Sequence, residues 1–168
     1  MGTKFSTRVW VSVVGIASIF FGSKGYADTV ISVADFGLKP DTRENAVAYV
    51  QKAIEACRGK EPVTLVFPEG RYDFWPQYAH EKNYYETNTY DVFPKRLAML
   101  FEGLHNITVD GNGSQFVMHD RIQPITVENC DGVTLKNFSI DWDIPLTAQA
   151  RVTKVGSDFF EIEINVLE

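Results

Sequence analysis

Apolar positions follow a helical period in only one stretch of the chain. Four of them recur at spacings of three or four residues and share one helix face: Val47, Val50, Ile54 and Cys57. Asp41 with Glu44 three residues later resembles a capping box, although Asp replaces the usual Ser or Thr. We therefore expect a helix of about four turns that begins after Asp41 and ends at Gly59.

Short apolar, β-branched runs separated by turn residues account for most of the remaining chain, a pattern typical of short strands. The predicted strands are 30–37 (running into a turn), 63–67, 71–74, 97–101, 107–109, 115–118, 124–127, 133–135 and 138–142. Beyond residue 146, apolar residues alternate with polar ones on both sides of Gly156, which predicts an antiparallel β-hairpin.

One phrase of the sequence occurs twice. Residues 106–111 match residues 132–137, and Phe101 and Val127 are separated by the same interval. Three short strands in each period are typical of a parallel β-helix, whose stacked coils bury inward-facing Ile, Val and Leu in a column. We expect the helix near the start of the chain to cover the open end of this stack.

These patterns predict an all-β protein with three segments. Residues 1–27 are set apart, residues 28–146 form a capping helix and the first coils of a parallel β-helix, and residues 147–168 form a hairpin that begins an inserted, incomplete β-subdomain. Two or three coils bury little surface, so we expect the chain to be the N-terminal part of a longer protein.

Residues 1–27 have the organisation of a secretory signal peptide. Lys4 and Arg8 precede an uncharged run over 9–21, and the segment ends in small residues up to Ala27. The run is shorter than the roughly 20 apolar residues that span a bilayer. We expect cleavage after Ala27 and a periplasmic or secreted protein without a membrane anchor.

Charge and cysteine content narrow the function classes. The net charge is −6, and removal of residues 1–27 leaves 13 basic and 22 acidic residues, a net charge of −9. This balance disfavours nucleic-acid partners. Cys57 and Cys130 are interpreted as two separate thiols in preference to a disulfide, and no zinc or calcium signature is present. We predict no metal and no cofactor.

Two sets of motifs resemble known proteins. Residues 33–37 (Val-Ala-Asp-Phe-Gly) and 66–72 (Val-Phe-Pro-Glu-Gly-Arg-Tyr) resemble the opening segment of pectate-lyase-like right-handed β-helix proteins. Residues 72–76 (Tyr-Asp-Phe-Trp-Pro), 84–88, 110–114, 118–119, 137–142 and 145–150 resemble glycoside hydrolase family 110, the bacterial exo-α-1,3-galactosidases. This resemblance covers about residues 30–166, and members of that family are several times longer.

The resemblance implies a right-handed β-helix and an activity. The family removes terminal α-1,3-linked galactose from glycans with inversion, using two carboxylic acids that leave room for a water, and no metal. The partner implied is a galactose-terminated oligosaccharide. The family's catalytic aspartates match no position here, so their positions are expected downstream and this chain alone is expected to be inactive.

Asp141 and Asp143 are the catalytic candidates that the residues themselves offer. On a strand they share a face about 6.5–7 Å apart, within the range for inverting carboxylate pairs. The alternative is that both close a turn before Pro145 while Trp142 lies in the core. His119 and Asp120 are adjacent, so their side chains are expected to point apart.

Residues 72–93 contain eight aromatic side chains and no clear period. Aromatic faces bind the apolar face of a pyranose, and Asn and Glu bind hydroxyl groups. We therefore predict a long loop over a cleft, with Trp75, Glu81, Tyr85 and Asn88 as substrate-binding candidates. The alternative is a loop held to the stack by its own aromatic side chains.

The sequence is also compatible with two other functions. A pectate-lyase-like polysaccharide lyase would need clustered calcium ligands and a basic residue, and an acidic chain fits a polyanionic substrate poorly. A non-catalytic carbohydrate-binding β-helix protein would bind oligosaccharide without turnover. Calcium dependence separates the first from a galactosidase, and turnover separates the second.

Overall fold

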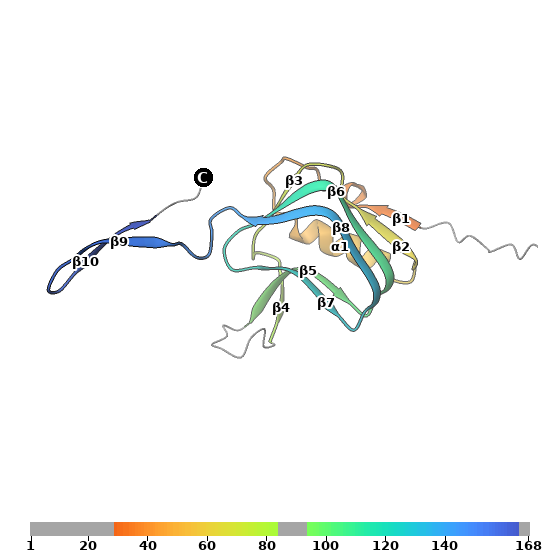
Figure 1. Cartoon of the computed structure of the whole chain (residues 1–168). Helices are drawn as coiled ribbons and strands as arrows, with labels where there is room; N and C mark the ends of the chain where they lie inside the picture. Colours follow the sequence, from red (N-terminus) through yellow and green to blue (C-terminus); the bar gives the residue numbers. More distant parts are fainter. Residues whose placement is uncertain (1–28, 84–93, 165–168) are drawn as a thin grey trace, which may run out of the picture.

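The computed structural model describes residues 29–83 and 94–164, and the predicted signal peptide, Tyr85 and Asn88 lie outside the described residues. The elements are strands joined by turns, with one α-helix near the start (Figure 1). They are β1 (Thr29–Ser32), the 3-10 helix η1 (Val33–Phe36), α1 (Val47–Cys57), β2 (Val63–Val66), β3 (Arg71–Phe74), β4 (His80–Lys82), β5 (Lys95–Glu102), β6 (His105–Met118), β7 (Gln123–Glu128), β8 (Asp131–Trp142), β9 (Ala150–Val155) and β10 (Phe160–Ile164).

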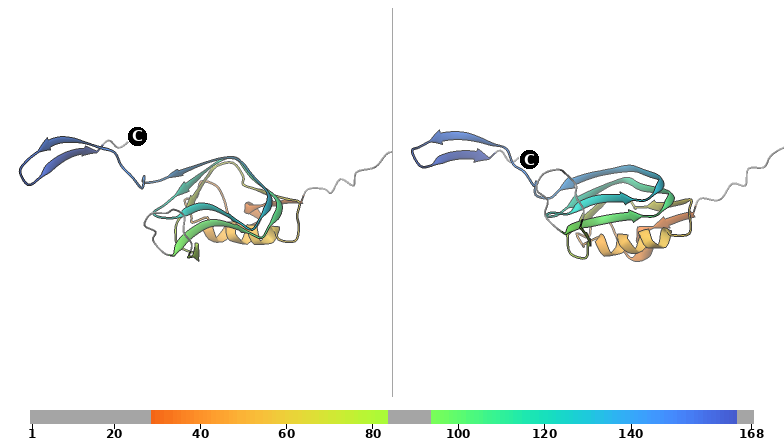
Figure 2. Two further views of the ribbon diagram at one scale, coloured as in Figure 1. Left: turned by 60° about the horizontal axis from the view of Figure 1, so that its bottom comes forward. Right: turned by 90° about the horizontal axis from the view of Figure 1, so that it is seen from below.

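Parallel strands stack in register and form the body of the molecule. β1, β2, β6 and β8 pair side by side, and β3 joins the second half of β6. β7 pairs in parallel with β5, and the short β4 pairs with the other side of β5 in antiparallel fashion. Figure 2 shows the resulting stack from two further sides, with α1 beneath the strands.

The pairing confirms the repeat seen in the sequence. Val133 lies opposite Ile107 on the β6–β8 ladder, and Val127 lies opposite Phe101 on the β5–β7 ladder. The register changes between Asp110 and Ser114, where β6 carries two more residues than β8. The interval between paired positions is therefore slightly shorter in the second half of these strands, where Ser114 pairs with Phe138.

The coil that leads from β2 and β3 to β6 is longer than the coil that leads from β6 to β8. Val63 pairs with Ile107 and Arg71 pairs with Gln115, so these partners are much further apart in sequence than those of the β6–β8 ladder. The additional residues lie between Phe74 and β5 in the sequence, and they include β4. The aromatic segment 72–93 begins within β3, where Tyr72 and Phe74 are in the core, and continues into this interval.

The predicted helix is present, but it begins later than expected. Its buried face carries the four predicted residues and Ala53. Asp41 is not its cap, because the backbone of Asp41 has a φ of +62° and its Oδ1 accepts a hydrogen bond from the backbone N of Arg71 at 3.0 Å. The N-cap position is Ala46, which makes no side-chain cap, and Oδ1 of the preceding residue, Asn45, accepts a hydrogen bond from the backbone N of Val47 at 3.1 Å.

A second boundary also differs from the prediction. The strand expected over 30–37 ends at Ser32, where a capping box starts η1. The Ser32 hydroxyl accepts from the backbone N of Ala34 at 3.2 Å, and the Asp35 carboxylate accepts from the backbone N of Ser32 at 3.2 Å. Gly37 ends the turn with a φ of +92°, a conformation that favours glycine.

The core lies between the stacked strands and α1. Aromatic rings form a connected group in its centre, in which Phe116 contacts Phe67, Phe74 and Phe138 at centroid distances of 4.8–5.6 Å. Trp142 packs against this core, and its Nε1 is buried without a hydrogen-bond partner among the described residues. 

The two cysteines are separate thiols, as the sequence analysis preferred. Cys57 and Cys130 are both free. Cys57 lies on the buried face of α1, and its burial raises the pKa of the thiol to about 11. The Cys57 thiol is therefore protonated at neutral pH and behaves as a small apolar side chain.

The predicted hairpin is confirmed as an antiparallel pair of β9 and β10, with an irregularity between Glu161 and Ile162. It projects away from the stack in both Figure 1 and Figure 2. Several of its large apolar side chains are exposed, among them Val152, Phe160 and Ile164. Among the described residues, no helix is long and apolar enough to cross a membrane.

Gly111 provides a test of the stacking. A Cβ added there would lie 2.5 Å from Cβ of Phe138 and 2.7 Å from the carbonyl O of Asn137, on the neighbouring strand. We expect Gly111→Ala to lower the free energy of unfolding by about 1–3 kcal/mol, the usual cost of overpacking. Thermal or urea unfolding followed by circular dichroism measures this change.

Thr134→Ala, at an exposed position on β8, is the control and should change the free energy of unfolding by less than about 0.5 kcal/mol. Equal stability of both variants would contradict the observed register.

Candidate functional site

Six side chains converge where β3, β6 and β8 end. We call them the carboxyl-end cluster: Arg43, Arg71, Asp73, Trp75, His119 and Asp143. The parallel register explains the convergence, because Phe74, Met118 and Trp142 lie opposite one another at the ends of the three strands. The residue that follows each of them therefore emerges at the same level of the stack.

The ladder continues one step beyond the strands. The backbone N of His119 donates to the carbonyl O of Phe74 at 2.9 Å, and the backbone N of Asp143 donates to that of Met118 at 3.0 Å. Side chains alternate along a strand, so Arg71, Asp73 and Trp75 share the face opposite Tyr72 and Phe74, which are in the core. The cluster is therefore a product of local alternation and long-range register together.

Asp73 lies at the centre of the cluster and is 1% exposed. Its Oδ1 accepts from Nη2 of Arg71 at 2.6 Å and lies 2.8 Å from Nε2 of His119, while Oδ2 accepts from Nε of Arg71 at 3.0 Å. Burial opposes ionisation, but the hydrogen bonds from Arg71 and His119 outweigh it and hold the pKa of Asp73 below its ordinary value. Asp73 is therefore a buried, ionised anchor.

His119 is oriented by two neighbours. Its ring stacks on that of Trp75 with a centroid distance of 3.9 Å and an interplanar angle of 7°. Because the Asp73 carboxylate can only accept, Nε2 of His119 carries the hydrogen of their bond. In the neutral imidazole, Nδ1 is then an acceptor, and it lies 3.7 Å from Oδ2 of Asp143.

Asp143 is the solvent-accessible carboxylate of the cluster, with a side chain that is 42% exposed. Its Oδ1 accepts from Nη2 of Arg71 at 3.2 Å, so one guanidinium joins a buried and an accessible carboxylate. The hydrogen bond to Asp73 raises the pKa of Arg71 above its ordinary value. Burial lowers this pKa, and the bond to Asp143 raises it further. The arrangement offers the free oxygen lone pairs of Asp143 to a ligand.

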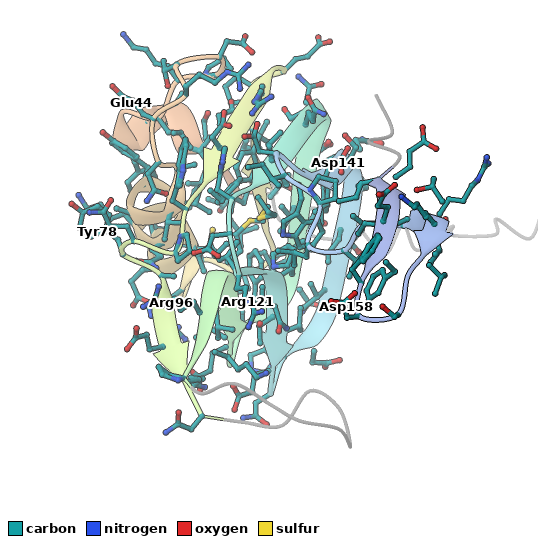
Figure 3. The ribbon with its side chains drawn as sticks, turned by 90° about the vertical axis from the view of Figure 1, so that its left-hand side faces the viewer. Glu44, Tyr78, Arg96, Arg121, Asp141 and Asp158 are labelled. Atoms are coloured by element: carbon teal, nitrogen blue, oxygen red, sulfur yellow. The ribbon has the colours of Figure 1, made fainter. Side chains whose placement is uncertain are left out.

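Asp141, the other predicted catalytic candidate, has a different environment. Its Oδ1 accepts from the backbone N of Trp142 at 2.8 Å, and its side chain is exposed on β8. Figure 3 labels Asp141 at the end of β8 and Arg96 on β5, two strands from different walls of the stack. The structure thus brings Asp143, but not Asp141, into the described cluster.

Glu81 lies in a second polar group. A pocket of about 630 Å³ is lined by Glu81, Lys82, Asn83, Thr126, Val127 and Glu128. Nζ of Lys82 donates a hydrogen bond to Glu102 at 2.8 Å and another to Glu128. These bonds, above all the one to Glu102, raise the pKa of Lys82, although desolvation opposes the change. Glu81 lies 3.4 Å from Nε of Arg96. Trp75 and Glu81, predicted on one binding loop, therefore belong to two separate groups.

Sequence reasoning did not identify Arg71, Asp73 or His119 as site residues. The alternation Arg71-x-Asp73-x-Trp75 was a usable signal, since it places three polar or aromatic side chains on one strand face. His119 was predicted only to point away from Asp120, and it bonds to Asp73 instead. Within residues 29–83 and 94–164, no group of three or more His, Cys, Asp or Glu is arranged to hold a metal ion.

Comparisons with known proteins show extensive sequence similarity to named enzymes. The chain is 62% identical over 139 residues to alpha-1,3-galactosidase B of Bacteroides thetaiotaomicron. The aligned region covers 83% of this chain and 23% of the relative. It is 37% identical over 136 residues to alpha-1,3-galactosidase A of Shewanella woodyi (81% of this chain, 22% of the relative). It is 36% identical over 159 residues to alpha-1,3-galactosidase B of Phocaeicola vulgatus (92% of this chain, 25% of the relative).

No family model matches the chain. The chain spans between 22% and 25% of the length of these curated relatives. The aligned segments cover between 81% and 92% of this chain.

The ionised state of Asp73 predicts how the free energy of unfolding depends on pH in acid. Its pKa is lower in the folded chain than its ordinary value, so protonation favours the unfolded state. The stability that it contributes is complete above the unfolded pKa of about 3.9 and is lost as pH falls through the folded value. We expect Asp73→Asn to cost about 1.5–3 kcal/mol at pH 7, the usual loss of hydrogen bonds to a charged group, and less at pH 3.

Urea unfolding between pH 3 and pH 7 measures this difference. Asp131→Asn is a suitable control, because Asp131 is exposed. If Asp73→Asn lowers the free energy of unfolding by the same amount at pH 3 and at pH 7, the ionised form of Asp73 does not stabilise the fold through its bonds to Arg71 and His119, and the prediction is wrong.

Proposed function

We propose that this chain forms the capping helix and first coils of an exported bacterial glycoside hydrolase that removes terminal α-1,3-linked galactose from glycans. The observation that carries the proposal is 62% identity over 139 residues to a protein named alpha-1,3-galactosidase B. The substrate is a galactose-terminated oligosaccharide. Export follows from the signal-peptide pattern of residues 1–27.

The architecture in this proposal is a right-handed parallel β-helix. Support comes from the in-register parallel ladders, from the sequence interval shared by β6–β8 and β5–β7, and from the position of α1 beneath the strands (Figure 2). The hairpin of β9 and β10 begins an inserted β-subdomain in this arrangement. The strands of each coil bring residues distant in sequence to one wall of the stack, as glycan recognition requires.

The proposed chemistry is inverting hydrolysis by two carboxyl groups. One protonates the glycosidic oxygen, and the other activates a water on the opposite face of the sugar, which requires a separation of about 6.5–9.5 Å between them. We place this pair in the longer enzyme, beyond the present residues, so that Asp141 and Asp143 are not its acid and base. This chain contributes part of the surface that binds the glycan.

Galactose release tests the proposal. The substrate is an α-1,3-galactosyl disaccharide, incubated with residues 28–168 alone and with a longer enzyme that contains them, each with and without EDTA. We expect release only by the longer enzyme and no effect of EDTA, because the proposed chemistry uses carboxyl groups without a metal.

Each other result changes the assignment. Release by residues 28–168 alone would place the chemistry within this chain and make Asp141 and Asp143 the catalytic pair. Absence of galactose release by either protein, together with calcium-dependent cleavage of an acidic polysaccharide that EDTA abolishes, would favour the polysaccharide lyase. Saturable glycan binding without release by either protein would favour the non-catalytic carbohydrate-binding protein.

A further inference from the structure

We propose that Asp143 and His119 form a subsite for a neutral pyranose, in which two neighbouring hydroxyl groups of the sugar donate hydrogen bonds to Oδ2 of Asp143 and Nδ1 of His119. The inference rests on the proposed function and deepens it, since it names the atoms of this chain that touch the glycan. Asp73 and Arg71 act as positioning residues for these two groups.

The two carboxylates of the carboxyl-end cluster differ in how many of their hydrogen-bond acceptor sites remain accessible. Asp73 is 1% exposed, and both of its oxygens already accept hydrogen bonds within the protein. Asp143 is 42% exposed, and its Oδ1 receives one bond from Arg71. Of the two carboxylates, Asp143 is the one that keeps solvent-accessible acceptor sites.

The gap between His119 and Asp143 defines the ligand. Nδ1 and Oδ2 are 3.7 Å apart, which is too long for a direct hydrogen bond. Because the bond to Asp73 fixes the hydrogen on Nε2, the neutral imidazole presents a lone pair at Nδ1 beside the lone pairs of Asp143. Two adjacent acceptors favour two donors, and a pair of hydroxyl groups on neighbouring ring carbons supplies them.

The same geometry selects against acidic sugars. The Arg71 guanidinium lies between Asp73 and Asp143, so its charge is already matched within the protein. A uronic acid carboxylate would face the Asp143 carboxylate, and both arginines of the cluster, Arg43 and Arg71, are already paired with the cluster's own carboxylates. The subsite therefore favours a neutral pyranose over galacturonate.

The arrangement is held in place before a ligand arrives. Trp75 stacks on the His119 ring, the Asp73 carboxylate fixes its Nε2, and the backbone bond to Met118 fixes Asp143. Such preorganisation reduces the entropy lost when a sugar binds. Trp75, predicted from sequence as a substrate-binding residue, contributes here by positioning the histidine.

The test is calorimetric titration of the full chain with methyl α-galactoside, comparing Asp143→Asn with Asp141→Asn. The first substitution keeps an oxygen for Arg71 but turns the other acceptor into a donor, and we expect Kd to rise at least about tenfold. Asp141→Asn changes the same side chain two residues earlier, outside the cluster, and should leave Kd unchanged. Melting temperatures of both variants report folding.

A second measurement uses the unmodified chain, so it does not depend on how a variant folds. Two of the singly deoxygenated methyl α-galactosides, lacking hydroxyl groups on neighbouring carbons, should bind about tenfold more weakly than the parent sugar, and methyl α-galacturonate should not compete. Equal Kd values for Asp143→Asn and Asp141→Asn, equal binding of all deoxy sugars, or no saturable binding of the parent sugar would overturn the subsite.

The two proposals can fail separately. Galactose release by the longer enzyme together with equal binding by the two variants would overturn the subsite and leave the galactosidase assignment intact. Binding that depends on Asp143 without galactose release by any longer enzyme would support the subsite and overturn the assignment.

Discussion

The in-register pairing of parallel strands is the constraint on which the rest of the structure depends. It places Val133 on Ile107 and Val127 on Phe101, so that apolar side chains continue from one coil to the next. It also aligns the last residues of β3, β6 and β8, which is why His119 and Asp143 approach Asp73. A shift of one residue would turn the polar face into the core and the core to solvent, because side chains alternate along each strand.

A buried charge at the edge of this stack requires compensation. Asp73 is surrounded by Arg71, His119 and, at 3.8 Å, Arg43, and these neighbours keep it ionised despite its burial. The compensation ties together three strands and the segment that precedes α1, since the backbone N of Ala46 also donates to the carbonyl O of Asp73. The same bonds determine which atoms of His119 and Asp143 remain available for recognition.

The sequence predicted those features that depend on local spacing. The buried face of α1, the hairpin and the register of the repeat all follow from intervals between apolar residues, and the structure confirms them. The start of the helix was wrong because Asp41 bonds to Arg71, far along the chain, and not to the helix. The carboxyl-end cluster was missed because β3 and β6 are related by a longer interval that no sequence repeat displays.

The unequal lengths of successive coils have a bearing on how such proteins diversify. Closing a longer loop costs entropy only logarithmically, about 0.6 kcal/mol for each doubling of length, and the coil that leads to β6 is less than twice as long as the coil that leads from β6 to β8. Chain can therefore be added after Phe74 at little thermodynamic expense while the ladders on either side keep their register. Loops of different length and composition can occupy this corner while the same ladders carry them.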